Sequence, residues 1–299
     1  MSWKITVHAP AEVVRAALVA HEDAEDWDFS IVLGGGQIDR EAPGAWQLEA
    51  WLEREPEAED KAAIAALFAC GAPDLIVEEL ADADWVTLSQ QNVEPIREGP
   101  FYVRTPDHPP APAERDFVIP ASQAFGTGHH ETTAGCLSML AHIKAQGLVV
   151  RNIADIGTGT GLLAFAALHL WQRARATASD IDALCGPVVA ENAALNGIAL
   201  GDGPGKLGMV IAAGMEHPLL RAAAPYDLLI ANILAGPLAE LAPAFAKAVT
   251  PGGSVLLAGL LTAQEPTVRS AYTRAGFSLR ARMQRGNWSI LWLRRRTGR

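Results

Sequence analysis

The stretch Asp155-Ile156-Gly157-Thr158-Gly159-Thr160-Gly161 decides the fold. It follows a short apolar run, Ile153–Ile156, and precedes an apolar stretch of helical length, Leu162–Trp171. Glycines at a strand-to-helix turn allow a tight bend and let a ligand approach the backbone, and the helix N-terminus offers unpaired N–H groups. The sequence therefore predicts a ligand-binding turn, with a plain strand–turn–helix connection as the alternative.

The spacing of these glycines bears on the kind of ligand. A dinucleotide-binding turn would carry glycine at position 162 to serve a pyrophosphate, and this chain carries Leu162. The acid Asp155 before the glycines also favours a ligand without phosphate, such as S-adenosylmethionine. A nicotinamide-dependent dehydrogenase is the alternative from another enzyme class, and Leu162 is the residue that argues against it.

Outward from this turn, strands and helices alternate, which predicts a doubly wound parallel sheet. The expected strands are residues 153–156, 176–179, 206–212, 227–233 and 254–258, and the expected helices are residues 162–171, 183–195, 238–248 and 265–275. Pro251-Gly252-Gly253 is expected to form a turn. Residues 277–284 and 288–293 then form a hairpin that adds an antiparallel strand, as in class I methyltransferases.

Residues 1–80 have a different pattern, which predicts a small α+β ferredoxin-like domain. The expected strands are residues 3–8, 27–33, 45–52 and 74–80, the expected helices are residues 11–21 and 57–69, and Gly34-Gly35-Gly36 is expected to be a loop. Residues 81–100 are polar and contain two prolines, so we expect a linker there. The catalytic domain would then span residues 101–299.

Charge and composition narrow the classes further. The 299 residues are 49% hydrophobic, which excludes a disordered chain, and no apolar run is long enough to cross a membrane. Residues 1–80 hold 17 acidic and 5 basic residues, whereas the rest of the chain is near neutral. This is either a well-solvated small domain or a docking module for a basic partner, and it argues against sequence-specific binding of nucleic acid. The seven arginines between positions 280 and 299 are expected to be a solvated edge, with a contact to RNA near the substrate as the alternative.

Two polar residues follow later strands of the predicted sheet. Asp180 ends a strand 23 residues after Gly157, where a carboxylate can accept both hydroxyl hydrogens of a ribose. Asp182 is expected to be the N-cap of the next helix. Asn232 leaves the strand at residues 227–233, and its carbonyl oxygen can accept a hydrogen bond from an amine nucleophile. The alternative for Asn232 is a residue that merely turns the chain.

A glycine loop precedes another helix. The stretch Ala124-Phe125-Gly126-Thr127-Gly128 leads into His129-His130-Glu131-Thr132-Thr133 and a helix to about Lys144. Either Thr132 or Thr133 caps this helix, or the loop folds over the cofactor and a threonine hydroxyl holds its carboxylate. Adjacent histidines point apart on a helix, so no metal site is expected. The three cysteines are far apart, which argues for a reducing, cytoplasmic setting.

Taken together, these motifs resemble the PrmA family, whose members methylate ribosomal protein L11. The residues that carry the resemblance are Phe125-Gly126-Thr127-Gly128, Thr132-Thr133, the glycine turn, Asp180-Ile181-Asp182, Glu191-Asn192-Ala193, Asn196-Gly197, residues 231–238 and residues 251–253. The resemblance implies a cytoplasmic monomer. It also implies methyl transfer to lysine amines, and to an N-terminal amine as a further acceptor, with S-adenosylhomocysteine as the product.

The resemblance also implies roles for single residues. Asn232 would orient the accepting amine as well as contact the cofactor. The expected cofactor-binding residues are Phe125, Gly126, Thr133, Asp155, Gly157, Gly159, Asp180 and Asn232. The N-terminal domain would capture the ribosomal protein. Pro120-Ala121-Ser122-Gln123 and Glu131 depart from the family pattern, which leaves the geometry of this loop open.

Two alternatives stay open at this point. One is a lysine methyltransferase of another protein, such as a subunit of an electron-transfer flavoprotein. The other is a nucleoside-binding adaptor without catalytic activity. The presence of an N-terminal domain argues against the first alternative, because those relatives resemble the catalytic domain alone. Only an assay of methyl transfer separates the second.

Overall fold

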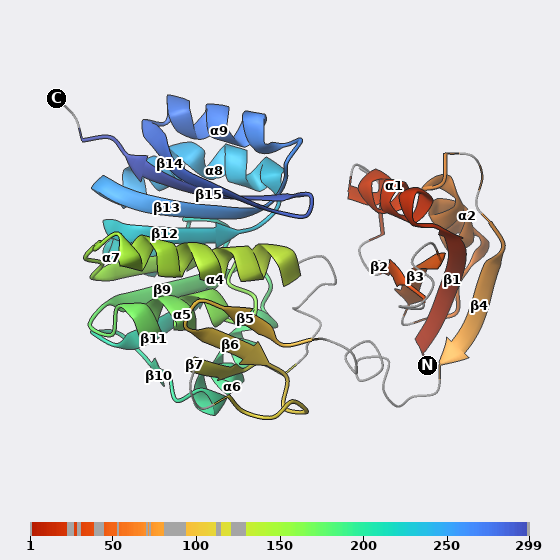
Figure 1. Cartoon of the computed structure of the whole chain (residues 1–299), viewed down its shortest axis with the longest axis horizontal. Helices are drawn as coiled ribbons and strands as arrows, with labels where there is room; N and C mark the ends of the chain where they lie inside the picture. Colours follow the sequence, from red (N-terminus) through yellow and green to blue (C-terminus); the bar gives the residue numbers. More distant parts are fainter. Residues whose placement is uncertain are drawn as a thin grey trace. The chain divides into compact units, whose positions relative to one another are not determined.

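The computed structural model describes residues 2–22, 27–28, 31–38, 45–52, 54–69, 71, 73–80, 94–111, 115–120 and 130–297. The chain forms two compact units, Met1–Asn92 and Val93–Arg299. Figure 1 shows the first in red to orange and the second in yellow to blue.

The first unit is a four-stranded sheet with two helices. Its elements are β1 (Ser2–Pro10), α1 (Ala11–Glu22), β2 (Val32–Gln37), β3 (Ala45–Leu52), α2 (Ala58–Ala66) and β4 (Leu75–Leu80). The strands pair in the order β2-β3-β1-β4, and every pair is antiparallel, which is the order of a split βαβ sandwich. Ile5 and Val7 alternate into a core that they share with Leu48 and Ala50.

The glycine triplet in this unit lies in a strand, so the prediction of a loop there was wrong. Gly34-Gly35-Gly36 belongs to β2, and Trp27 precedes that strand with its indole N–H bonded to the Ile31 carbonyl at 3.2 Å. A Cβ on Gly35 would come within 2.7 Å of Leu18 and 2.9 Å of Val14. The glycine therefore allows α1 to pack closely on the strand.

The second unit contains the predicted doubly wound sheet. Its strands run β10-β11-β9-β8-β12-β13-β15-β14 across the sheet. The strand bounds are β8 (Asn152–Ile156), β9 (Arg175–Asp180), β10 (Ala199–Leu200), β11 (Lys206–Ile211), β12 (Tyr226–Asn232), β13 (Val249–Leu261), β14 (Phe277–Arg285) and β15 (Trp288–Arg295). Among these described strands β15 alone runs antiparallel to the sheet, so the terminal hairpin was predicted correctly.

Helices cover both faces of this sheet. The helices are α4 (His130–Ala145), α5 (Leu162–Leu170), α6 (Cys185–Leu195), α7 (Pro218–Ala223), α8 (Ala235–Ala248) and α9 (Glu265–Arg274). One core contains side chains of α4, α5 and α6, and the other contains side chains of α7, α8 and α9. Alternate residues of each central strand enter the two cores; Ile153 belongs to the first and Ala154 to the second. This double burial explains why these strands read as continuous apolar runs.

A second, small sheet packs on the outside of α4 and α5. It consists of β5 (Ile96–Glu98), β6 (Phe101–Arg104) and β7 (Arg115–Val118). Ile96–Glu98 was expected to lie in the linker, but Ile96 is buried in the core and its strand pairs with β6. Residues 81–93 lie outside the described part of the chain.

Several element ends differ from the predictions. Pro251-Gly252-Gly253 lies within β13, where Tyr226 pairs with Val249 but Leu228 pairs with Ser254, so the intervening residues form an irregularity and not a turn between elements. The predictions also missed β7, β10 and α7, which are short and lack a clear apolar period.

The basic C-terminal segment is only partly a solvated edge, because Arg280 and Arg296 are exposed whereas four other arginines have partners. The Arg294 guanidinium donates to the Gly252 carbonyl at 2.7 Å, and Arg295 donates to the Val249 carbonyl. Arg282 pairs with Glu265 at 2.6 Å, and Arg285 pairs with Glu98 at 2.7 Å. These four arginines therefore hold the irregular start of β13 and the outer hairpin in place.

Candidate functional site

The predicted polar residues meet at the carboxyl edge of the large sheet. Strands β9, β8 and β12 are neighbours and run parallel, with Ile156 of β8 opposite both Ser179 and Ala231. The glycine turn, Asp180 and Asn232 follow the ends of these three strands. This is the edge where sheets of this type bind ligands.

The glycine turn is held against β9. The N–H groups of Gly157 and Thr158 donate to the Ser179 carbonyl at 2.8 and 3.0 Å. Gly157 and Gly161 have φ angles of +71° and +86°, which favour glycine. A Cβ on Gly157 would overlap the side chain of Ile233, so only glycine allows these two segments to approach so closely.

Asp155 lies beneath the turn, with only 1% of its surface exposed. Its Oδ2 accepts hydrogen bonds from the Thr158 hydroxyl at 2.7 Å and from the Ala164 N–H at 3.1 Å, while its Oδ1 has no partner. Burial, opposed by these two hydrogen bonds, raises the pKa of this carboxyl to about 7. In this geometry Asp155 fixes the turn to the start of α5, and its predicted contact with a cofactor stays a prediction.

Asp180 is half-buried at the end of β9 with both oxygens oriented. Its Oδ2 accepts from the Gly159 N–H at 2.8 Å, and its Oδ1 accepts from the Asp182 N–H at 3.1 Å. Each oxygen retains a lone pair for a further donor. Asp182 is not the N-cap of α6, because that helix begins at Cys185; its Oδ1 accepts from the Leu184 N–H within the preceding turn.

Asn232 ends β12 with its side-chain oxygen unused. This Oδ1 atom is buried and has no hydrogen-bond partner, as is the case for the Ser179 hydroxyl on β9. The next residue, Ile233, lies between two glycines: its side chain covers Gly157, and its backbone would overlap a Cβ on Gly259. Gly259 has a φ angle of +81°. The two glycines therefore set the position of Asn232.

Thr132 and Thr133 are both buried in the first turn of α4, which begins at His130, so neither is the helix cap. Burial raises the pKa of the Cys136 thiol, one turn after Thr133, and the charge of the nearby Asp155 carboxylate raises it further. Phe125 and Gly126 lie outside the described residues. The helix therefore begins earlier than predicted and includes Thr133, whose contact with a cofactor stays a prediction.

Asn192 of α6 and Asn196, the residue that caps the carboxyl end of this helix, have positions that the sequence did not explain. Asn192 donates to the Thr160 carbonyl of the glycine turn at 3.0 Å. Asn196 bonds both the N–H and the C=O of Val118, each at 2.8 Å, and so extends β7 like a paired strand. Their spacing of four residues, which places them on one face of a helix, was the available signal.

The site offers hydrogen-bond acceptors in a partly apolar setting. The unpartnered oxygens of Asp155, Ser179 and Asn232 lie on three neighbouring strands, and Ile181 and Leu234 leave large parts of their side chains exposed beside them. Such acceptors suit the hydroxyl and amine hydrogens of a nucleoside and an amino acid. Among the described residues, no group of three or more histidine, cysteine, aspartate or glutamate side chains is placed to hold a metal ion. No helix within the described ranges is long and apolar enough to span a membrane.

Comparison with known protein families gives a match over nearly the whole chain. The model of the family described as ribosomal protein L11 methyltransferase (PrmA) matches residues 12–296. A relative from Brucella suis, named ribosomal protein L11 methyltransferase, is 37% identical over 286 residues, which are 95% of this chain and 96% of the relative. A relative of the same name from Agrobacterium fabrum is 37% identical over 254 residues, covering 84% of this chain and 85% of the relative.

A solved structure is similar as well. The crystal structure of ribosomal protein L11 methylase from Lactobacillus delbrueckii subsp. bulgaricus superposes with a TM-score of 0.57 at 27% sequence identity. The match covers 68% of this chain and 100% of that chain.

Proposed function

The chain belongs to the ribosomal protein L11 methyltransferase (PrmA) family, and on this premise we propose that it methylates lysine amines of ribosomal protein L11. The enzyme is an S-adenosylmethionine-dependent methyltransferase. Lysine as the acceptor, with the N-terminal amine as a second one, is the proposed part. The observation that carries the proposal is the buried, unpartnered Oδ1 of Asn232 at the carboxyl end of β12.

The residues present fit the cofactor. The exposed lone pairs of Asp180 suit the two ribose hydroxyls, and the close-packed glycine turn gives backbone access to the rest of the nucleoside. We assign the amino-acid end of the cofactor to Thr133, on the first turn of α4. When bound, S-adenosylmethionine supplies an electrophilic methyl group on a sulfonium sulfur.

Asn232 would orient the acceptor. Its Oδ1 accepts a hydrogen bond from the neutral amine, which directs the amine lone pair toward the methyl carbon. This amine would accept the methyl group of bound S-adenosylmethionine as the sulfur–carbon bond breaks, and the positive charge would pass from sulfur to nitrogen. The methylated ammonium then loses a proton to solvent. Because a free lysine has a pKa of about 10.4, removal of the amine from water helps to populate its neutral form. We assign no general base, and orientation supplies much of the rate.

The acidic first unit would capture the substrate. Its Lys4 is already paired with Glu49 and Glu78, each at 3.4 Å, so the unit's excess acidic residues present a negative surface to a partner. A lysine-bearing ribosomal protein has the complementary charge. We expect the apparent affinity of the enzyme for ribosomal protein L11 to fall as the salt concentration rises from 50 to about 500 mM, because the Debye length shortens. A salt-independent affinity would contradict electrostatic capture.

Mass measurement tests the reaction directly. The protein is incubated with S-adenosylmethionine and purified ribosomal protein L11, and the intact mass and the modified residues of the substrate are determined. We expect steps of one methyl mass on lysines, blocked by S-adenosylhomocysteine. Asn232→Ala should lower the rate by about 10²-fold or more while the protein stays folded, and Asn232→Asp, which retains an acceptor oxygen, should retain more activity.

Two results would contradict the proposal. Methylation found only at residues other than lysine or the N-terminus would refute the acceptor. Unchanged turnover in Asn232→Ala would refute the assigned role of that side chain. If the protein binds S-adenosylhomocysteine but methylates no ribosomal protein, it is a nucleoside-binding adaptor without catalytic activity.

A further inference from the structure

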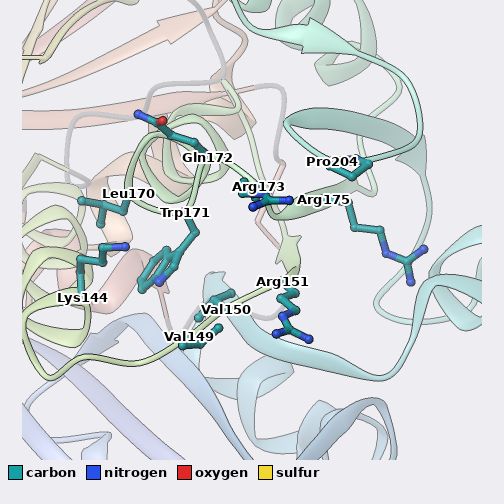
Figure 2. Close-up of a pocket in the computed structure, with 10 residues that line it drawn as sticks. All are labelled: Lys144, Val149, Val150, Arg151, Leu170, Trp171, Gln172, Arg173, Arg175 and Pro204. Carbon is teal, nitrogen blue, oxygen red and sulfur yellow. The ribbon is translucent and has the colours of Figure 1, made fainter.

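A basic pocket lies at the opposite edge of the large sheet from the methyl-transfer site. It has a volume of about 750 Å³ and is formed where α4 and α5 end and where β8 and β9 begin. We call it the arginine pocket; Figure 2 shows its lining residues, which are Lys144, Val149, Val150, Arg151, Leu170, Trp171, Gln172, Arg173, Arg175 and Pro204. Its size is that of a site for a small molecule.

The charge of the pocket is positive. Four of its lining side chains are cationic, and none is acidic. Two neighbouring features oppose this charge. The carboxyl ends of α4 and α5 each carry roughly half a negative charge. Asp227 lies close by, since its Oδ2 accepts the Arg151 and Asn152 N–H groups at 2.8 and 3.1 Å. Together these offset about half of the positive charge, so an excess of about two positive charges remains.

The four cations differ in how they are held. Arg175 donates to the Asn152 side-chain oxygen at 3.1 Å and to the Ala223 carbonyl at 2.9 Å. The Lys144 ammonium lies 5.4 Å from the centre of the Trp171 ring. Arg151 and Arg173 are exposed, and within the described ranges no ion pair or side-chain hydrogen bond engages them. Two guanidinium groups are therefore available to a ligand, in a pocket that also contains a hydrogen-bonded arginine and a lysine beside an aromatic ring.

We propose that the arginine pocket binds a small anion with two or more phosphate groups. Guanidinium groups donate in a fork that matches phosphate oxygens, and two of them can bridge adjacent phosphates. The exposed face of Val149 and the ring of Pro204 give apolar wall for an organic part of such a ligand, as in a nucleoside diphosphate. An RNA chain fits less well, because few of its phosphates would meet a cation in a pocket of this size.

The test measures binding of two probes to the full-length protein by calorimetry at low salt. Inorganic tripolyphosphate reports the shared phosphate chemistry, and ADP reports whether the nucleoside adds affinity. Saturating S-adenosylhomocysteine is present, so that the glycine turn is occupied. We expect saturable binding of tripolyphosphate, weakened at least 10-fold in the double variant Arg151→Ala/Arg173→Ala.

A matched control removes the same charge elsewhere. Arg274→Ala/Arg280→Ala deletes two exposed arginines of α9 and β14, and it should bind both probes as the wild type does. The double variant Arg151→Lys/Arg173→Lys keeps the charge but loses the paired donors of the guanidinium groups. Its affinity for the probes should therefore lie between that of the wild type and that of Arg151→Ala/Arg173→Ala. Thermal unfolding shows that each variant is folded, and S-adenosylhomocysteine binding should be unchanged in all of them.

Each outcome decides the proposal. The proposal is supported if Arg151→Ala/Arg173→Ala loses binding and the control variant does not. Tighter binding of ADP than of tripolyphosphate identifies a nucleotide as the ligand. An equal loss in the control variant would show nonspecific charge attraction. Binding of the probe that appears only when S-adenosylhomocysteine is left out would place the anion at the glycine turn. Either result, or the absence of saturable binding in the wild type, overturns the proposal, as does a short RNA that competes more strongly than both probes.

Discussion

Replacing Gly259 by alanine should disable Asn232 without touching it. Gly259 lies in β13 with a φ angle of +81°, and an alanine Cβ there would come within 2.8 Å of the Ile233 carbonyl carbon and 2.9 Å of its nitrogen. The carbonyl oxygen is closer still. All three atoms belong to the backbone, so the overlap cannot be relieved by rotation of a side chain.

The size of the effect follows from this geometry. The Ile233 carbonyl carbon would lie about 0.6 Å closer to the alanine Cβ than ordinary contact distance. To remove this overlap, Ile233 and the adjoining Asn232 must shift by at least a similar amount. Because a misplacement of about 1 Å can cost roughly 10²-fold in rate, we expect kcat/KM to fall by roughly 10- to 100-fold. The left-handed conformation itself costs alanine about 1–2 kcal/mol of stability.

Gly252→Ala provides the control for strain. Gly252 belongs to the same strand and has a φ angle of +79°, but its Cβ would meet only side-chain atoms at 3.5 and 3.6 Å. Both variants should unfold at a lower temperature, whereas only Gly259→Ala should lose activity. The assay is transfer of labelled methyl groups to ribosomal protein L11 well below the melting temperature of either variant. Equal activity per folded molecule in the two variants would refute the reasoning.

Two further predictions concern residues that hold the site. Asn196→Ala removes both side-chain hydrogen bonds to Val118, so we expect a loss of about 1–3 kcal/mol in the free energy of unfolding, measured by denaturant titration; a variant as stable as the wild type would show that the clamp contributes nothing. Asp155 has a folded-state pKa raised to about 7 from an ordinary 3.8, so its folded form retains a proton between these values and its stability contribution is lost as the pH rises through 7. The melting temperature of the wild type relative to Asp155→Asn should therefore rise as the pH falls from 8 to 5, and a difference that is constant over this range would contradict the raised pKa.

Much of the large sheet could be predicted, because its strands carry signals that do not depend on distant contacts. Ile153–Ile156 is apolar except for Asp155, and glycines at alternate positions follow it, so the local sequence indicated its end and the start of α5. The carboxyl-edge positions of Asp180 and Asn232 then followed from the rule that parallel strands end at one edge.

The features that were missed depend on contacts between distant segments. Gly35 has the local character of a loop, and only the approach of Val14 and Leu18 makes it suitable for a strand. Val118 pairs with β6 on one side, but its hydrogen bonds to an asparagine side chain 78 residues away have no local signal. The packing of Ile233 between Gly157 and Gly259 also depends on distant segments, since each glycine alone is consistent with an ordinary turn.

The strand order has a consequence for how the chain folds during synthesis. β14 leaves the ribosome before β15, yet within the described sheet β15 is its partner and also separates it from β13. The outer two strands must therefore close on each other as a hairpin, through the Gly286-Asn287 turn, before or as they dock on the rest. Local hairpins form within microseconds, whereas translation adds residues at about 5–20 per second. In the interval between the synthesis of β13 and that of β15 the domain thus exposes β13, the strand that positions Asn232, as an open edge, and a partner that covers this edge on the nascent chain would delay the appearance of an active site.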